Sequence, residues 1–327
     1  MNIAVLGAGA WGTALAISFS DRHTVSLWGR DPVQREALER ERINRRYLPG
    51  VVFPESLHIA PQLEGVLSNA GLILIATSTG GLAETLNRAK TVRAPILWAC
   101  KGFDRTTGRL PHEIVAELMP PETRYGALSG PSFAMEVARG LPCALTLAAN
   151  DFAFARRMAA ELNGPALRIY SSDDLIGVEL GGALKNVMAI AAGICDGMQL
   201  GMNARAALIT RGLAEMVRLG LAMGGKAETF MGLTGLGDLV LTATGDLSRN
   251  RTVGMKLADG KTLEIILAEL GHVAEGVNSA QTTLERAKAY QVDMPITAAV
   301  NAVLFENANP RETVKRLLSR EARTEVR

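Results

Sequence analysis

A glycine-rich turn directly after the first apolar run most constrains what this chain can fold into. The run NIAVLG (Asn2–Gly7) is typical of a strand, and the segment Gly12–Asp21 has the composition of a helix. Between them, GAGAWG places Gly7, Gly9 and Gly12 in the pattern G-x-G-x-x-G. In such a setting the first glycine allows a tight turn, and the second, which has no side chain, lets a ligand approach the backbone closely. The third lets the helix pack closely on the strand. The pattern therefore predicts the opening unit of an α/β sheet.

Short apolar runs and helical patterns alternate through the rest of the N-terminal half. Val, Ile and Leu are continuous in these runs, which is typical of parallel strands that are covered on both faces. The predicted strands after the first are Thr24–Gly29, Gly71–Thr77, Pro95–Cys100, Tyr125–Gly130 and Cys143–Ala149. We therefore expect a doubly wound, mostly parallel Rossmann-type α/β domain over residues 1–172.

Beyond about Ser171 the strand signals stop and long helical patterns follow. Asp173 or Asp174 is placed to cap the first of them, which includes the apolar stretch GVELGGALKNVMAIAAG (Gly177–Gly193). Further helices are predicted at Asn203–Met223, Ser248–Leu257, Thr262–Leu270, Ser279–Tyr290, Pro295–Phe305 and Arg311–Leu318. We expect an all-helical C-terminal domain over residues 173–327.

The composition excludes several classes of protein. A net charge of +2 over 327 residues provides no field for nucleic acid or an anionic membrane, and the basic cluster Arg40–Arg46 is interpreted as a solvated helix face. Three separated cysteines, Cys100, Cys143 and Cys195, favour neither a disulfide framework nor a zinc site, so a cytoplasmic location is expected. The chain begins in a strand pattern, and its apolar runs fall short of the ~20 residues of a membrane helix. We expect neither a signal peptide nor membrane insertion.

The glycine turn also predicts the ligand of the sheet. A bare second glycine before a helix N-terminus suits the pyrophosphate of a dinucleotide. An NAD-specific site places an acid after the second strand, but Asp31 precedes Pro32 and is better explained as a helix N-cap. Arg30 is either a solvated surface residue or the partner of the 2′-phosphate of NADP. The pattern favours NADP without excluding NAD.

Polar residues follow two later strands at the edge where ligands bind in open α/β sheets. Lys101 comes directly after Pro95–Cys100, where its ammonium can face an anionic ligand or bulk water. Gly130 and Ser132 lie at the turn after Tyr125–Gly130, where free N–H groups and a hydroxyl are available. Ser132 can serve as a helix cap, as a ligand contact, or as both.

One cation, Lys185, interrupts the apolar helix that opens the second half. Desolvating a lysine costs several kcal/mol, so the burial calls for a reason. Hydride transfer to a ketone develops an alkoxide, and a lysine whose pKa is lowered by burial is a suitable proton donor. The alternatives are a lysine that extends along the helix to solvent, or one paired with Glu179.

A glycine-rich segment, Phe230–Gly254, carries a second polar group. Asp238 is placed either to orient Lys185 or to bind a substrate hydroxyl. If Asp246 caps the next helix, Ser248, Arg249 and Asn250 lie in its first turn, where N–H groups, a hydroxyl and a guanidinium converge. Such a turn suits a phosphate ester, although a capped surface helix with solvated arginines has the same sequence.

These motifs together resemble one known family. GAGAWGTALA, LWGR, LSGPSFAMEVA, GVELGGALKNVMAIAAGICDG, RAALITRGLAEM, TFMGLTGLGDLVLTATGDLSRNRTVG and AEGVNSA follow the order of the bacterial NAD(P)-dependent glycerol-3-phosphate dehydrogenases. The resemblance implies Lys185 as the proton donor and acceptor. Implied substrate contacts are Lys101, Gly130, Ser132, Asp238, Ser248, Arg249 and Asn250. Implied cofactor contacts, besides the glycine turn, are Ala10, Trp11, Arg30, Lys101, Ala134, Arg249 and Glu275; the last rests on the resemblance alone.

The resemblance implies reduction of dihydroxyacetone phosphate to sn-glycerol 3-phosphate, with NADP or NAD as cofactor, by a homodimer that feeds glycerophospholipid synthesis. A reductase of a β-hydroxy acid or ketopantoate is an alternative, since such enzymes share the domain plan and a helix lysine. A nucleotide-sensing regulator is a third, although it leaves Lys185 without a purpose. No metal is expected, because no ligand-like spacing occurs among His23, His58, His112 and His272.

Overall fold

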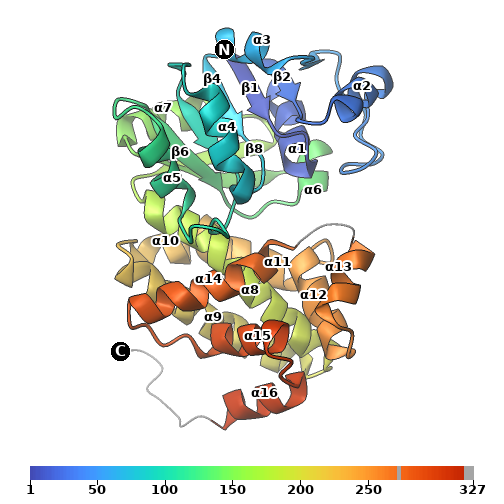
Figure 1. Ribbon diagram of the computed structural model, residues 1–327, viewed down its shortest axis with the longest axis vertical. Helices are drawn as coiled ribbons and strands as arrows, with labels where there is room; N and C mark the ends of the chain where they lie inside the picture. The colour runs from blue at the N-terminus through green and yellow to red at the C-terminus, as the bar shows by residue number, and fades with distance from the viewer. Residues whose placement is uncertain (271–273, 320–327) are drawn as a thin grey trace. The chain divides into compact units, whose positions relative to one another are not determined.

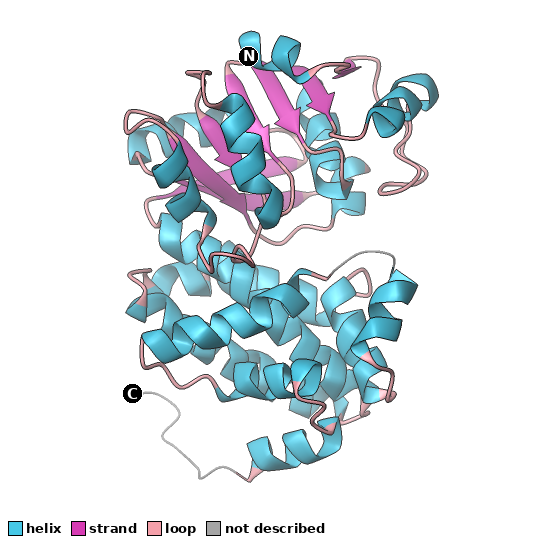
Figure 2. Ribbon diagram, in the orientation of Figure 1, coloured by secondary structure: helices cyan, strands magenta, loops and turns pink. Residues whose placement is uncertain are grey.

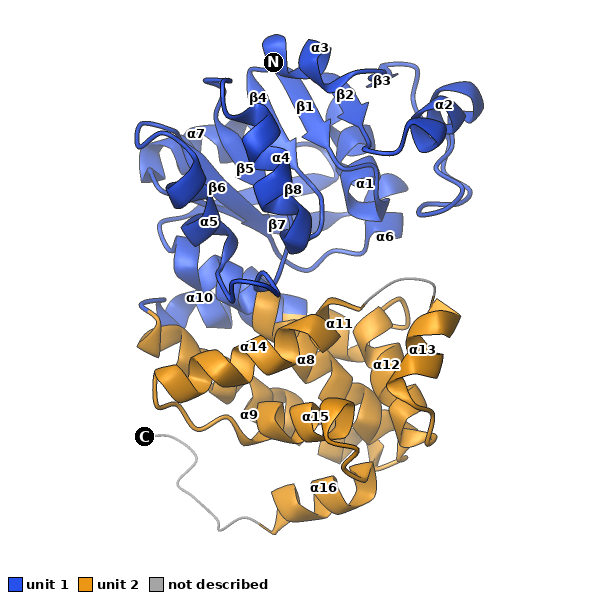
Figure 3. Ribbon diagram, viewed as in Figure 1, with its two compact units in different colours: residues 1–182, 224–238 blue, residues 183–223, 239–327 orange. Residues whose placement is uncertain are grey.

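The computed structural model describes residues 1–270 and 274–319, and the chain divides into two compact units (Figure 3). The first unit consists of Met1–Gly182 and Gly224–Asp238, and the second of Ala183–Met223 and Leu239–Arg327. Within the described ranges, every strand belongs to the first unit (Figure 2). The observed fold confirms the predicted class, an α/β domain followed by helices.

The first unit is built on one eight-stranded sheet with the strand order β3-β2-β1-β4-β5-β6-β7-β8 (Figure 1). All neighbouring pairs are parallel except β6 and β7, which are antiparallel. Because β1 lies between β2 and β4, the strand order reverses there, which is where open α/β sheets bind ligands. The strands are β1 (Asn2–Leu6), β2 (Thr24–Trp28), β3 (Leu57–Ile59), β4 (Leu72–Ile75), β5 (Ile96–Trp98), β6 (Tyr125–Ser129), β7 (Cys143–Ala149) and β8 (Leu167–Ser172).

Two of these strands, β3 and β8, were not predicted. β3 has only three residues, too few for a recognisable pattern. β8 lies at the sheet edge, where Leu167 and Ile169 are buried and Arg168 and Tyr170 are exposed. Its alternation differs from the continuous apolar runs of the central strands, which is why a search for such runs missed it.

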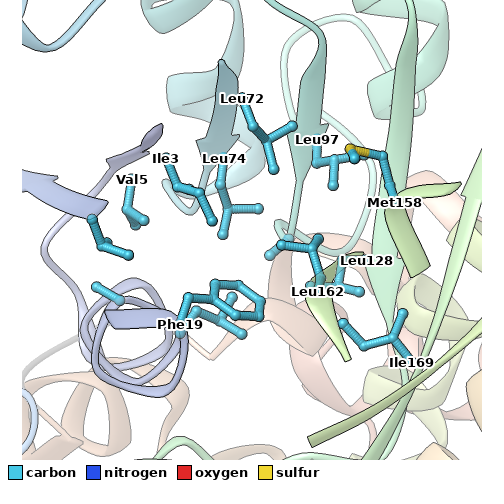
Figure 4. Packing of buried hydrophobic residues seen from close by; sticks show 14 of the residues in the cluster. Ile3, Val5, Phe19, Leu72, Leu74, Leu97, Leu128, Met158, Leu162 and Ile169 are labelled. Atoms are coloured by element: carbon cyan, nitrogen blue, oxygen red, sulfur yellow. The ribbon is translucent and has the colours of Figure 1, made fainter. Parts of the chain in front are cut away.

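The central strands are buried on both faces, as their composition predicts. In β1, Ile3 and Val5 belong to one hydrophobic cluster, whereas Ala4 and Leu6 belong to another. The first cluster continues through β4, β5 and β6 to α1, where Phe19 is 1% exposed (Figure 4). Burying a side chain of this size contributes about 1.5–3 kcal/mol to stability. Hydrophobic clusters on both faces therefore stabilise the sheet that carries the loops at its edges.

The first unit contains the sheet and a set of mostly short helices. They are α1 (Ala10–Ser20), α2 (Pro32–Glu41), α3 (Leu63–Ser68), α4 (Leu82–Ala89), α5 (Pro111–Leu118), α6 (Ala134–Ala138), α7 (Phe152–Leu162) and α10 (Ala227–Met231), with single turns η1 (Thr79–Gly81) and η2 (Leu233–Gly237).

The predicted helix face at Arg40–Arg46 is wrong in its second half. α2 ends at Glu41, and Arg42 adopts a left-handed conformation. Its guanidinium donates to the carbonyl oxygens of Pro54 (2.8 Å) and Leu57 (2.7 Å). This arginine therefore closes a loop, a role that a charge pattern alone does not indicate.

The longest helix, α8 (Leu175–Gly197), begins in the first unit and ends in the second. Asp174 caps it by accepting from the N–H of Gly177 (2.8 Å), as predicted. Contrary to the expectation from apolar runs, α8 is long and apolar enough to span a membrane, but 89% of the relevant window is buried inside the protein. The other helices of this part are α9 (Gly201–Ala222), α11 (Asp238–Thr244), α12 (Arg249–Ala258), α13 (Leu263–Leu270), α14 (Glu275–Ala289), α15 (Pro295–Phe305) and α16 (Pro310–Leu318).

Candidate active site

The glycine turn after β1 has the geometry that a dinucleotide needs. Gly7 has φ +121°, and a Cβ at Gly12 would overlap the carbonyl oxygen of Gly7. A Cβ at Gly9 would meet nothing within 4 Å, so the backbone there borders open space. The first turn of α1 has no side-chain cap, which leaves its N–H groups for an anion. The residues present therefore fit a pyrophosphate.

Two predicted cofactor contacts lie near this turn. Trp11 and Ala134 pack against the same small hydrophobic cluster, which joins α1 to α6. The indole Nε1 of Trp11 is buried and has no hydrogen-bond partner among the described residues. A buried donor without a partner is costly, so this atom is available to a ligand.

The two charged residues after β2 have different surroundings. Asp31 accepts from the N–H of Val33 (2.9 Å) and caps α2 with Pro32 at its first position, as predicted. Arg30 is largely exposed and forms an ion pair with Glu84 (3.2 Å), which is also exposed. Such pairs contribute little in water, so the guanidinium can exchange this partner for a phosphate.

The polar residues after β5 and β6 meet at one place in the first unit. Lys101 Nζ donates to Asp238 Oδ2 (2.7 Å) and to the carbonyl oxygen of Gly130 (3.0 Å). The Asp238 side chain is fully buried and that of Lys101 is 12% exposed. The Ser132 hydroxyl donates to the same Gly130 carbonyl (3.1 Å). The sequence pattern allows Asp238 either to orient Lys185 or to bind a substrate hydroxyl. The structure adds an ion pair between its buried carboxylate and Lys101.

A cysteine lies beside this ion pair. Cys143 Sγ donates to the carbonyl oxygen of Pro131 (3.3 Å). Burial raises the pKa of its thiol to about 11, partly offset by the charge of Lys101. The thiol therefore stays protonated near neutral pH and is a poor nucleophile.

Lys185 is buried in the second unit, with 7% of its surface exposed. Its Nζ donates to Thr242 Oγ1 in α11 (3.0 Å). The extended, solvated alternative is therefore wrong. Glu179 lies six residues earlier, and at about 100° per residue the two side chains leave α8 in different directions. The Glu179 carboxylate instead accepts from Trp98 Nε1 (3.0 Å) and contacts the His112 ring.

The burial of Glu179 has an electrostatic consequence of its own. Desolvation raises the pKa of its carboxyl group, while the contacts with His112 oppose that rise. The acid belongs to the packing of α8 against β5 and α5, and this gives it a role of its own in an apolar helix.

A chain of hydrogen bonds next to Lys185 connects Asn186 with Glu275, two residues to which no sequence motif assigns a role. Asn186 Nδ2 donates to Glu275 Oε2 (3.1 Å), and Asn250 Nδ2 donates to Asn186 Oδ1 (2.9 Å). Asn250 Oδ1 in turn accepts from the N–H of Gly276 (2.9 Å). These residues come from α8, α12 and α14. Asn186 is adjacent to Lys185, but its partners Asn250 and Glu275 lie 64 and 89 positions away. No local sequence pattern connects residues at such separations.

The predicted phosphate turn has a different cap from the one expected. Ser248, not Asp246, is the N-cap of α12, and its Oγ accepts from the N–H of Arg251 (3.2 Å). Asp246 lies two residues too early and instead forms an ion pair with Arg251 (3.1 Å). Ser248 still has its hydroxyl proton to donate, and Arg249 is exposed at the first position of α12.

The structure thus groups the predicted residues into two sets, one in each unit. In the first unit are Gly7, Gly9, Ala10, Trp11, Gly12, Arg30, Lys101, Gly130, Ser132, Ala134 and Asp238. In the second unit are Lys185, Ser248, Arg249, Asn250 and Glu275. Among the described residues no group of three or more His, Cys, Asp or Glu could hold a metal ion, and His272 lies outside them.

Both parts of the chain match one protein family. Residues 2–155 match the N-terminal part of NAD-dependent glycerol-3-phosphate dehydrogenase, and residues 174–315 match its C-terminal part. A relative from Janthinobacterium sp. (strain Marseille), named glycerol-3-phosphate dehydrogenase [NAD(P)+], is 58% identical over the full length of both chains. One of the same name from Herminiimonas arsenicoxydans is 56% identical, also over the full length of both.

Solved structures agree with these relatives. A crystal structure of glycerol-3-phosphate dehydrogenase from Coxiella burnetii is 42% identical, with a TM-score of 0.92. The match covers 97% of this chain and 98% of that one. With sequence, fold and length in agreement, the chain belongs to the NAD-dependent glycerol-3-phosphate dehydrogenase family.

Proposed function

We propose that this protein reduces dihydroxyacetone phosphate reversibly to sn-glycerol 3-phosphate with NADH or NADPH. One observation carries the assignment: a full-length match to enzymes named for this reaction, in a chain whose α8 buries a lysine. The full-length relatives named for this reaction favour it over the hydroxy-acid reductase and nucleotide-sensor hypotheses.

The dinucleotide is assigned to the glycine turn of the first unit. When bound, the reduced cofactor supplies the hydride. Gly9 would leave room for its pyrophosphate, Gly7 and Gly12 keep the turn tight, and the N–H groups of Ala10 and Trp11 would face its charge. Arg30 would pair with a 2′-phosphate. Contacts from Lys101, Ala134, Arg249 and Glu275 complete the proposed set.

Lys185 is the proposed proton donor for the developing alkoxide. A buried ammonium group can both stabilise that charge and deliver a proton to the oxygen. Thr242 holds its Nζ in place through the hydrogen bond described above. In the oxidation direction the same amine would take the proton back.

The remaining residues are proposed to hold the substrate. Ser248, Arg249 and Asn250 offer a hydroxyl, a guanidinium and the start of α12 to the phosphate. In the first unit Lys101, Gly130, Ser132 and Asp238 are assigned to the substrate by family resemblance. The Lys101–Asp238 pair keeps the lysine in a fixed position, which supports a contact with a small polar molecule.

Further parts of the proposal concern the cellular setting. We assign the cofactor-binding domain to residues 1–172, which end with β8, and the substrate domain to residues 173–327. The free cysteines support a cytoplasmic location. A homodimer is inferred from the family, and sedimentation of the purified protein tests it. The product is a precursor suited to glycerophospholipid synthesis.

A kinetic panel tests the function. Purified protein is assayed with dihydroxyacetone phosphate, ketopantoate and a β-keto acid, each with NADH and with NADPH. We expect turnover of the triose phosphate alone, and a lower KM for NADPH if Arg30 contacts the 2′-phosphate. Turnover of a keto acid without turnover of the triose phosphate would refute the substrate assignment. Binding of NADH or NADPH without its oxidation by any of these substrates would indicate a nucleotide sensor.

A further inference from the structure

The residue after the phosphate turn points away from solvent. Arg251 has a side chain that is 14% exposed, and its Nε donates to Asp196 Oδ2 (2.7 Å) near the end of α8. Arg205 of α9 donates to the same oxygen through Nη1 (2.9 Å) and is 15% exposed. One largely buried carboxylate therefore joins three helices of the second unit. Arg251 is therefore not one of the solvated surface arginines that the sequence also allows.

The backbone of Arg251 is fixed at the same time. Its N–H donates to the Ser248 cap, and a Cβ at Gly193 would overlap its carbonyl oxygen, so α12 rests directly on α8. The ion pair with Asp246 adds little, because that side chain is 97% exposed. The anchor of the turn is thus the Arg251–Asp196 contact together with close packing on Gly193.

The charges of this cluster also matter for an anion. Two guanidinium groups share the largely buried carboxylate of Asp196, and the exposed Asp246 balances the second of them through its pair with Arg251. Interactions in such a poorly hydrated place are screened less than at the surface. The cluster therefore fixes the turn, and the positive charge offered to a phosphate there is that of the exposed Arg249.

We propose that Arg251, oriented by Asp196, is a positioning residue that holds the Ser248–Asn250 turn at a set distance from Lys185. α8 carries both Asp196 and Lys185, so the contact ties the phosphate turn to the helix of the proton donor. A displacement of about 1 Å between a binding group and the reacting centre is enough to slow catalysis strongly. The inference rests on the proposed function, because it concerns where that substrate's phosphate is held.

The chain offers a matched pair of variants, Arg251→Met and Arg205→Met. Both remove one arginine from the same oxygen at similar burial, so their effects on thermal stability should be alike. We compare kcat/KM for dihydroxyacetone phosphate with kcat/KM for dihydroxyacetone, which lacks the phosphate. Arg251→Met should lower the ratio of the two by about 10- to 100-fold, whereas Arg205→Met should change it less than about threefold. Arg251→Lys should restore part of the ratio.

Each outcome decides a separate question. An equal loss on both substrates in Arg251→Met, or equal ratios in the two variants, would show a purely structural role and overturn the inference. If Arg251→Met does not fold, the same ratio of kcat/KM values is measured for Arg251→Lys and Asp196→Asn. A ratio that stays unchanged in both variants overturns the inference. If the unaltered protein does not reduce dihydroxyacetone phosphate at all, the proposed function itself has failed.

Discussion

The two units place their candidate residues by different means. In the first, the turn at Gly7 and the loops after β5 and β6 follow directly from where strands end, and much of the anion site is backbone. In the second, Asn186, Asn250 and Glu275 come from three helices and are joined side chain to side chain. A site made of backbone is sensitive to an added Cβ, and one made of side chains is sensitive to the loss of a single polar group.

The largest effect is expected at Lys185. Lys185→Ala should lower kcat by about 10²- to 10⁴-fold, the range for loss of a general acid, while cofactor binding persists. Steady-state kinetics and a fluorescence titration with NADH measure the two quantities. Lys226→Ala is the control, since that lysine pairs with Asp173 at the surface. Near-normal turnover in Lys185→Ala would remove the assigned role.

Two glycines test the backbone-built site. Gly12→Ala forces a Cβ onto the Gly7 carbonyl, so we expect a loss of stability of about 1–3 kcal/mol, as for other overpacked sites, and weaker cofactor binding. Gly9→Ala meets open space and should leave the melting temperature unchanged while still weakening cofactor binding. Thermal melts and NADH titrations separate the two. Undiminished affinity in Gly9→Ala would mean that the pyrophosphate lies elsewhere.

The phosphate turn of the second unit gives an intermediate effect. Arg249→Ala should raise the KM for dihydroxyacetone phosphate about 10- to 100-fold, the value of one or two charge-assisted hydrogen bonds. Arg311→Ala, another exposed arginine of the second unit, is the matched control and should leave KM unchanged. An unaltered KM in Arg249→Ala would count against phosphate binding at α12.

The smallest effect concerns a buried acid outside the hydrogen-bond chain. Glu215 accepts from the N–H groups of Ile296 (2.6 Å) and Thr297 (3.2 Å), and burial raises its pKa to about 7. The folded protein therefore holds this proton more tightly than the unfolded chain does. Stability from this group is lost as pH rises, by about 1.4 kcal/mol between pH 6 and pH 8.

Glu215→Gln isolates that contribution. Urea unfolding of both proteins at the two pH values gives the difference directly, and the variant should gain relative stability at the higher pH. A difference that does not change with pH would show that the carboxyl group is ionised throughout this range.

Much of the fold could be predicted because its signals are local. The turn at Gly7, the central strands and the N-cap at Asp174 each depend on a few adjacent residues. The strands β3 and β8 were missed because one is too short and the other alternates in exposure. The cap of α12 was misplaced by two residues, since Asp246 and Ser248 are equally good capping types and only the backbone path distinguishes them.

The sequence by itself determined the class of fold, the dinucleotide turn and the unusual lysine, because periodicity, glycine spacing and a charge among apolar residues can be read along the chain. Only the tertiary structure decided that Lys101 pairs with Asp238, that Glu275 is held by Asn186, and that Arg251 is an anchor. These contacts join residues from 55 to 137 positions apart. Their existence depends on how helices and loops pack, and no local pattern carries that information.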